Sequence, residues 1–306
     1  MSKRILTVAA ADPHDLRGFV AARLAVSPRQ AARLVAEGSV WVDGRRPSAT
    51  DRTPLHTGQR ITAYLEEALA RPAKVALPTV FSDEHLLVVD KPAGLPSQPG
   101  RRGGPSLLSL LPRGLFLVHR LDAEASGLVV LARDRETAAA LQETLQHGDT
   151  AREYLALVQG SLKQPAGQEG RIELRIGPLQ QDGDGAMVPR YQAHPQQSGH
   201  GQAAATRYQV LGQDAAGRTL VWLRLETGRT HQLRVHLAAI GHPIVGDRLY
   251  GGGGQAAGGG RLLLHAARLR LRHPLTGQTH LLTAAPPTEF GQLPAEAASE
   301  FSAPPS

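Results

Sequence analysis

The 306-residue sequence contains no cysteine. Disulfide bonds, thiolate nucleophiles and cysteine-based zinc or iron–sulfur sites are therefore excluded, and the lack of cysteine agrees with a reducing compartment. Aromatic residues are scarce, at 4% of the chain against 41% for all hydrophobic residues. We therefore expect a core built mainly from leucine, valine and alanine.

Long apolar segments are also missing. The apolar run at residues 5–10 is shorter than the core of a signal peptide, and no stretch approaches the about 20 apolar residues that cross a bilayer. We expect a cytoplasmic protein without membrane association. The glycines at residues 100–104 lack the spacing of a nucleotide-binding loop, and His231 and His236 are five residues apart, so we expect neither a nucleotide cofactor nor a metal.

The charge is biased towards basic residues. Lysine and arginine number 34 against 27 acidic residues, which gives a net charge of +7. Residues 1–72 alone hold 11 basic and 7 acidic side chains. A basic balance favours a polyanionic partner such as a nucleic acid.

The pattern of residues 1–72 predicts a small domain of two helices and a small sheet. Apolar residues recur at helical spacing from residue 16 to residue 24, and Ser27 followed by Pro28 marks the start of a second helix. Strands are expected at residues 40–42 and 60–65, the first ending in an Asp-Gly turn.

Three arginines of this domain are candidates for binding RNA. Arg29 and Arg33 lie four residues apart on one face of the second helix, and Arg45 follows the turn. Such a surface suits a phosphate backbone. The alternative is an ordinary solvated face, which charge alone does not exclude.

The rest of the chain predicts one catalytic-sized domain of class α+β. Prolines and weak periodicity indicate a linker at residues 73–78. Strands and helices then follow over residues 79–290, and the proline- and alanine-rich residues 291–306 are expected to form a disordered tail.

The loop at residues 120–125 is the first candidate for chemistry. An apolar strand at residues 115–119 precedes it and another, at residues 128–132, follows it. Arg120 and Asp122 are therefore held on a loop between rigid strands, where functional groups are often found. On this stretch alone, a hairpin turn in which Asp122 only caps backbone donors stays equally open.

Other charged and aromatic residues gain interest from their positions. Lys91 ends a buried strand, from which it could contact phosphate, although such a lysine is more often a surface cation. Tyr154 begins a strand, where a tyrosine is usually a packing residue. Arg229 and Arg234 belong to a segment with a capped helix that ends before Gly241.

Residues 1–72 resemble the small RNA-binding domain of the ribosomal protein S-four type. The resemblance lies in Asp15-Leu16, Ser27-Pro28-Arg29-Gln30-Ala31, Gly38-Ser39-Val40-Trp41-Val42-Asp43-Gly44-Arg45 and Gly58-Gln59-Arg60-Ile61. Pro28 stands where that family usually has a basic residue, and Asp43 where asparagine is common.

The second domain resembles the RluA-type pseudouridine synthases. The matching blocks, in order, are residues 86–96, His119-Arg120-Leu121-Asp122 with Ser126-Gly127, Arg152-Glu153-Tyr154, residues 228–236 with residues 241–247, and Leu264-His265-Ala266 with His273-Pro274. Three positions depart from the pattern: Ala125 replaces a usual threonine, Gln98 a frequent histidine and Arg152 a common lysine.

The resemblance implies a mixed, mainly antiparallel sheet with flanking helices, and an enzyme that isomerises uridine to pseudouridine in RNA without a cofactor. Asp122 would act at the sugar as nucleophile or base, and Arg234 would be its ion-pair partner. Tyr154 would stack on the uracil, and its hydroxyl could help proton transfer from C5. Arg120 would fill the space left by the flipped base, and Lys91 and Arg229 would hold backbone or neighbouring groups.

Two candidate substrates and two alternative functions follow from the sequence. Large-subunit ribosomal RNA is the first choice of substrate and transfer RNA the second, for an enzyme expected to be monomeric. The main alternative is a non-catalytic RNA-binding or ribosome-assembly factor, which has no reason to keep Asp122 and Arg234 together. A glycoside hydrolase using Asp122 and Glu124 fits poorly, since residues two apart are badly placed to flank a scissile bond.

Overall fold

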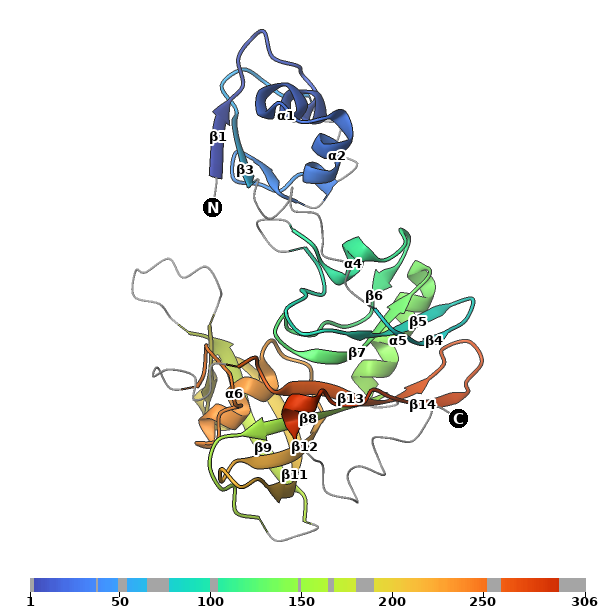
Figure 1. The fold of residues 1–306 in the computed structure, drawn as a ribbon, viewed down its shortest axis with the longest axis vertical. Helices are drawn as coiled ribbons and strands as arrows, with labels where there is room; N and C mark the ends of the chain where they lie inside the picture. Colours follow the sequence, from blue (N-terminus) through green and yellow to red (C-terminus); the bar gives the residue numbers. More distant parts are fainter. Residues whose placement is uncertain are drawn as a thin grey trace. The chain divides into compact units, whose positions relative to one another are not determined.

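The computed structural model describes residues 3–36, 38–48, 54–64, 77–99, 104–147, 150–164, 168–179, 190–251 and 260–291 (Figure 1). The chain divides into two compact units: residues 1–76 with 95–115, and residues 77–94 with 116–306. The predicted linker lies mostly outside the described residues, as does the predicted tail apart from Gly291. The division into domains at residues 73–78 therefore stays a prediction.

The first unit contains two longer helices, one short helix and a three-stranded antiparallel sheet. Its elements are β1 (Lys3–Thr7), α1 (Leu16–Leu24), α2 (Pro28–Ala36), β2 (Val40–Val42), β3 (Arg60–Tyr64) and the short α4 (Leu107–Leu110), with sheet order β1-β3-β2. Phe19 and Leu34 from the two long helices and Ile61 from β3 are fully buried in one core. The sequence did not predict β1, because its pairing with β3 is a contact between distant residues.

The structure has the helix start at Ser27 and the tight turn at Asp43-Gly44 that the sequence of this unit predicts. Ser27 Oγ accepts the Gln30 backbone N–H at 3.2 Å, and the Gln30 side chain accepts the Ser27 N–H at 2.9 Å. These reciprocal bonds satisfy two backbone donors that the helix itself leaves free. Asp43 and Gly44 both have positive φ, 46° and 76°, as the predicted tight turn between strands requires.

The second unit is built on an 11-stranded sheet. Its strands are β4 (Thr79–Ser82), β5 (Leu86–Lys91), β6 (Phe116–Leu117), β7 (Ser126–Ala132), β8 (Ala151–Val158), β9 (Gly170–Pro178), β10 (Tyr191–His194), β11 (Gln202–Gln213), β12 (Thr219–Leu225), β13 (Leu264–Arg272) and β14 (Thr279–Thr283). The order is β10-β9-β11-β12-β8-β13-β7-β5-β4, with β14 beside β13 and β6 beside β7. Among the described strands only β13 and β7 pair in parallel. The expected α+β class and mixed, mainly antiparallel sheet are confirmed.

The parallel contact lies at the centre of the sheet and depends on one glycine. Gly127 has φ of 110°, and a Cβ added there would lie 2.3 Å from the Ala266 carbonyl oxygen. Only glycine combines this backbone conformation with so close an approach. The approach joins β7 to β13 immediately after the loop that carries Asp122.

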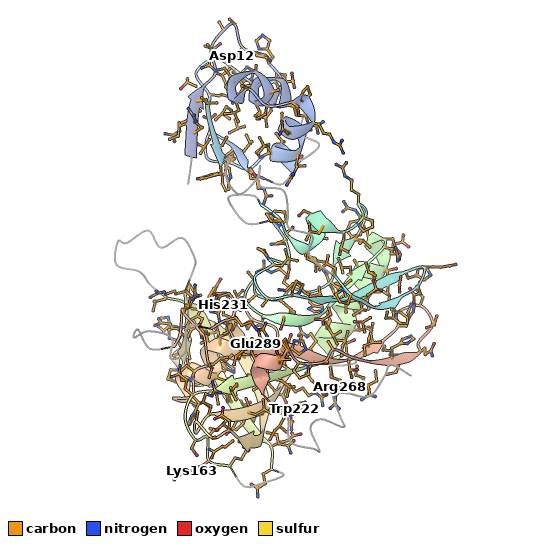
Figure 2. The ribbon with its side chains drawn as sticks, viewed as in Figure 1. Asp12, Lys163, Trp222, His231, Arg268 and Glu289 are labelled. Atoms are coloured by element: carbon orange, nitrogen blue, oxygen red, sulfur yellow. The ribbon has the colours of Figure 1, made fainter. Side chains whose placement is uncertain are left out.

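Two helices, α5 (Arg135–His147) and α6 (Gln232–Ala239), pack on the sheet. Asp134 caps the start of α5 by accepting the Thr137 backbone N–H at 2.7 Å. On the other part of the sheet, Trp222 and Arg268 lie beside each other (Figure 2) and both donate to the buried carboxylate of Glu153. This pairing neutralises a charge that would be costly to bury alone.

Candidate active site

The loop between β6 and β7 holds Asp122 at the edge of a cleft. Its backbone carbonyl accepts the Ala125 N–H at 3.2 Å, so the loop turns tightly after the carboxylate. Lys91, at the end of β5, is fully buried beneath it and donates to the carbonyls of Ala123 at 3.3 Å and Ala125 at 2.6 Å. The lysine therefore fixes the loop from below.

This position corrects the expectation that Lys91 contacts RNA. Its ammonium has no exposed surface and is also bonded to the Pro92 carbonyl at 2.9 Å. Burial lowers the pKa of Lys91 to about 8, against the opposing charges of Asp122 and Asp90. The sequence could not indicate this, because whether a strand end is covered depends on the segments that pack over it.

Arg234, on α6, connects three carboxylates. Its Nη1 donates to Asp122 Oδ2 at 3.0 Å, and its Nη2 lies 3.3 Å from Glu124 Oε2. Two further bonds of 2.8 Å join it to both carboxylate oxygens of Asp247. The planar guanidinium makes these bonds in a fixed fork, which a lysine cannot do.

The ion pairs of Arg234 differ in burial. The side chains of Arg234 and Asp247 are 3% and 0% exposed, whereas that of Asp122 is 23% exposed. Burial opposes the charge of Arg234, but the bonds and charges of Asp247 and Asp122 outweigh it and raise the arginine pKa. Asp247 thus anchors the guanidinium, and Asp122 is the partner that faces the cleft.

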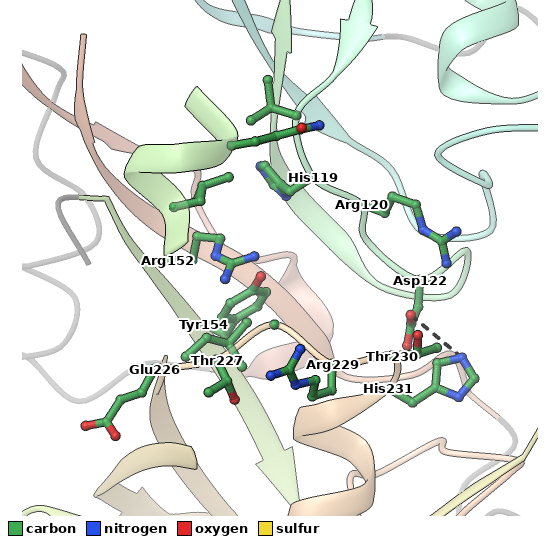
Figure 3. Close-up of a pocket in the computed structure, with 15 residues that line it drawn as sticks. His119, Arg120, Asp122, Arg152, Tyr154, Glu226, Thr227, Arg229, Thr230 and His231 are labelled. Carbon is green, nitrogen blue, oxygen red and sulfur yellow. Dashed lines mark ion pairs between the residues drawn. The ribbon is translucent and has the colours of Figure 1, made fainter. Parts of the chain in front are cut away.

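The cleft beside Asp122 has a volume of about 730 Å³. In the view of Figure 3, Asp122 and His231 lie on one side, Arg152 and Tyr154 on the other, and Arg229 between them. Its lining comes from the loop before β7, from β8, from α5 and from the β12–α6 connection: Val118, His119, Arg120, Asp122, Gln142, Leu145, Arg152, Tyr154, Leu225, Glu226, Thr227, Gly228, Arg229, Thr230 and His231. A smaller adjoining recess of about 70 Å³ is lined by Asp122, Tyr154 and Arg234 together.

The three residues predicted to be catalytic therefore meet at one place. Tyr154 is 4% exposed, and burial, aided by the charge of Asp122 and opposed by that of Arg152, raises its pKa. Its hydroxyl consequently keeps its proton at neutral pH. The alternative without catalysis gives no reason for Asp122 and Arg234 to lie together, and a large separation would have favoured it; the observed contact is 3.0 Å.

The remaining predicted residues occupy different surroundings. Arg120 and Arg229 are exposed and line the cleft, and Arg229 Nε donates to the Ala203 carbonyl at 3.1 Å. In the first unit, Arg29 and Arg45 are exposed and Arg33 is half-buried.

Comparison with known proteins identifies the family of the chain. Residues 85–239, which include Asp122, Tyr154 and Arg234, match the family model of RNA pseudouridylate synthase. The chain belongs to this family. It is 35% identical over 227 residues to the dual-specificity RNA pseudouridine synthase RluA of Escherichia coli K12, covering 72% of this chain and 96% of that protein.

Two further members of the RNA pseudouridylate synthase family show the same relation. Ribosomal large subunit pseudouridine synthase D of Nitrosomonas europaea is 36% identical over 254 residues, which is 77% of this chain and 68% of that protein. The structure of human RNA pseudouridylate synthase domain containing 1 superposes with a TM-score of 0.59 at 25% identity, covering 78% of this chain and 99% of that one. The protein is thus an RNA pseudouridine synthase of the RluA type, an isomerase that acts on RNA.

Sequence reasoning missed part of this pseudouridine synthase site. His231 Nε2 lies 3.8 Å from Asp122 Oδ1, and Asp247 is the buried anchor of Arg234. Both belong to blocks that carried the resemblance, yet neither was given a role. A block match alone shows that a residue fits the family pattern and does not show which atom it faces.

Two further properties of the described residues concern metal sites and membrane-spanning helices. Among them, no group of three or more histidine, aspartate and glutamate side chains is arranged to hold a metal ion. In the same part of the chain, no helix is long and apolar enough to cross a membrane.

Proposed function

We propose that this pseudouridine synthase modifies uridines in large-subunit ribosomal RNA, with transfer RNA as the second candidate substrate. One relative is named for the large ribosomal subunit and another for dual specificity. The net charge of +7 supports binding to a structured polyanion of either kind.

Asp122 is the residue that acts at the ribose. The reaction breaks the bond from ribose C1′ to uracil N1, forms a bond from C1′ to C5, and moves the proton of C5 to N1 in the overall balance. Asp122 acts either as a nucleophile at C1′, in a bond that is later broken, or as a base that removes a ribose proton and later returns it to the same carbon. In both cases its position on Arg234, at the cleft and within reach of solvent, is the observation that carries the proposal.

Tyr154 is the platform for the uracil. A base inside a helix cannot reach Asp122, so the target nucleotide must be turned out of its stack at a cost of a few kcal/mol. Stacking on an aromatic ring recovers about 1–3 kcal/mol per base. A protonated hydroxyl fits this stacking role and a hydrogen-bonding role better than that of a base.

Arginines of both units bind the RNA around the flipped nucleotide. Arg120 precedes Asp122 by two residues and fills the space that the uridine leaves, and Arg229 contacts neighbouring groups. The N-terminal domain of S-four type holds flanking RNA through Arg29, Arg33 and Arg45.

Mapping pseudouridines identifies the substrate directly. Total RNA from a strain without the gene is compared with RNA from the same strain carrying either the wild-type gene or an Asp122→Asn variant. We expect specific positions in large-subunit ribosomal RNA to lose pseudouridine in the deletion strain and to regain it only with the wild-type gene. Restoration by Asp122→Asn would contradict the role of Asp122, and changes confined to transfer RNA would select the second substrate.

A further inference from the structure

We propose that His231 is a positioning residue for Asp122: its neutral ring presents Nε2–H to the carboxylate, in a tautomer that Tyr250 fixes. This inference rests on the proposed role of Asp122. The lengths that support it are 3.8 Å from His231 Nε2 to Asp122 Oδ1 and 2.8 Å from His231 Nδ1 to the Tyr250 hydroxyl oxygen (Figure 3 shows the first).

The neighbours of the two ring nitrogens favour the tautomer of His231 that carries its proton on Nε2. Its hydroxyl oxygen accepts the Tyr191 backbone N–H at 3.1 Å, and its own hydrogen is then free to be donated to His231 Nδ1. An Nδ1 that accepts leaves the proton of a neutral imidazole on Nε2. The opposite tautomer would turn the Nε2 lone pair towards a carboxylate, which is electrostatically unfavourable.

The neutral form of His231 is also the one that its surroundings favour. Burial lowers its pKa, and Arg234 and Arg120 act in the same direction, against the carboxylates of Asp122 and Asp247. The groups that face the ring are therefore two carboxylates and two guanidinium groups, together with the phenols of Tyr191 and Tyr250, whose rings meet it edge to face at 5.7 Å each.

The backbone holds the ring firmly in this place. His231 precedes α6 with φ of 55°, in the left-handed region that few residues other than glycine, asparagine, aspartate and histidine adopt. Such a conformation costs of order 1–2 kcal/mol and persists where the surroundings impose it, often at functional sites. With its side chain 13% exposed, the ring has little freedom to leave.

The two carboxylate oxygens of Asp122 have different surroundings, and the Nε2–H of His231 faces only one of them. Oδ2 is held by Arg234, whereas Oδ1 receives no hydrogen bond from the described part of the chain. The 3.8 Å distance to His231 exceeds a hydrogen bond of about 2.9 Å by nearly 1 Å, and the proposed role of His231 requires the carboxylate to close this gap during the reaction. His231 thus restrains rotation of the carboxylate on the side that Arg234 leaves free. Its contribution falls on the chemical step and not on RNA binding.

The test compares two replacements at the same position. Asparagine tolerates the left-handed backbone and places an acceptor near Nδ1, but has no donor at the place of Nε2. Glutamine reaches that place with an amide N–H. The probe is total RNA labelled with 5-tritiated uridine in a strain that lacks the gene, and release of tritium from C5 measures single-turnover rates.

We expect His231→Asn to lower the single-turnover rate about 10- to 100-fold, the effect of losing a hydrogen bond to a charged group, with unchanged affinity for RNA. His231→Gln is expected to recover most of the loss. A full rate for His231→Asn, a loss of affinity without a loss of rate, or equal rates for the two variants would overturn the inference. Asp122→Asn separates the two proposals: if it stays active, the role of Asp122 is wrong, whereas an inactive Asp122→Asn beside a fully active His231→Asn contradicts only the role of His231.

Discussion

Asp122 and Asp247 both bind Arg234, but an Asp→Asn substitution should mainly lower activity at Asp122 and mainly lower stability at Asp247. Asp247→Asn removes a charge that is fully buried and that accepts two bonds from Arg234 as well as the N–H groups of Leu249 and Tyr250. Removing one partner of a buried ion pair costs about 3–5 kcal/mol, and the remaining pairs of Arg234 with Asp122 and Glu124 place Asp247→Asn towards the lower end of this range. Asp122→Asn removes a charge that is 23% exposed, and solvent screening reduces its cost to less than about 1 kcal/mol.

Activity should follow the reverse order. In the proposed role of Asp122, its replacement removes the nucleophile or base, and we expect the single-turnover rate to fall at least about 100-fold, the lower end of what a proton-transfer group contributes. Asp247→Asn leaves Asp122 in place and displaces only the arginine behind it. The fraction of this variant that stays folded should therefore keep part of the activity.

Thermal unfolding measures the first half of this prediction. The chain has two tryptophans, so a Trp41→Phe background leaves Trp222 as the only fluorescent reporter and follows the second unit alone. About 3–5 kcal/mol in a unit of this size corresponds to a decrease in Tm of about 6–20 °C for Asp247→Asn, against a few degrees for Asp122→Asn. Equal decreases for the two variants, or a larger one for Asp122→Asn, would refute the assignment of Asp247 as the buried anchor.

Three further predictions follow from single positions. Gly127→Ala should destabilise the second unit by more than about 3 kcal/mol in urea unfolding, because the added Cβ lies 2.3 Å from the Ala266 carbonyl oxygen. The control is Gly217→Ala, at φ of 73° with no atom within 4 Å of the added Cβ, which should cost only the backbone strain of about 1–2 kcal/mol. Lys91 has a pKa of about 8 in the folded protein, against an ordinary value of 10.5. Between pH 8 and 10.5 the unfolded chain therefore binds more protons than the folded one, and the stability rises with pH. The unfolding free energy of the wild type minus that of Lys91→Met should increase across this window, and a flat or falling difference contradicts the burial of the ammonium. Tyr154→Phe keeps the ring and should retain tritium release within about 10-fold, whereas Tyr154→Leu should lose about 5- to 150-fold, the equivalent of 1–3 kcal/mol of stacking; equal losses would exclude a stacking role.

Local signals predicted much of the fold. The start of α2 at Pro28 needed only the Ser27 cap and the spacing of the apolar residues that follow. The turn at Asp43 and Gly44 and the cap at Asp134 are decided within three or four residues in the same way. Such features depend on groups that are neighbours in the chain, and a single sequence contains them in full.

Contacts between distant residues were predicted less well. The strand expected at residues 115–119 is paired only at Phe116 and Leu117, because the chain then leaves the sheet to form the loop of the site. Residues 3–7 form an edge strand because they pair with β3. Lys91 was expected at the RNA surface and is buried under the Asp122 loop, since the burial of a charge depends on what packs over it.

The sequence by itself determined the chemical groups of this pseudouridine synthase and, through the order of its motif blocks, the family in which they act. It also determined most helix starts and turns, whose causes are local. Only the tertiary structure decided that Arg234, 112 residues after Asp122, meets that carboxylate with its guanidinium already held by Asp247, and that His231 faces the remaining oxygen. The reason is physical: the strength and direction of an ion pair depend on distance and burial, and both are set by packing between segments that the sequence alone does not bring together.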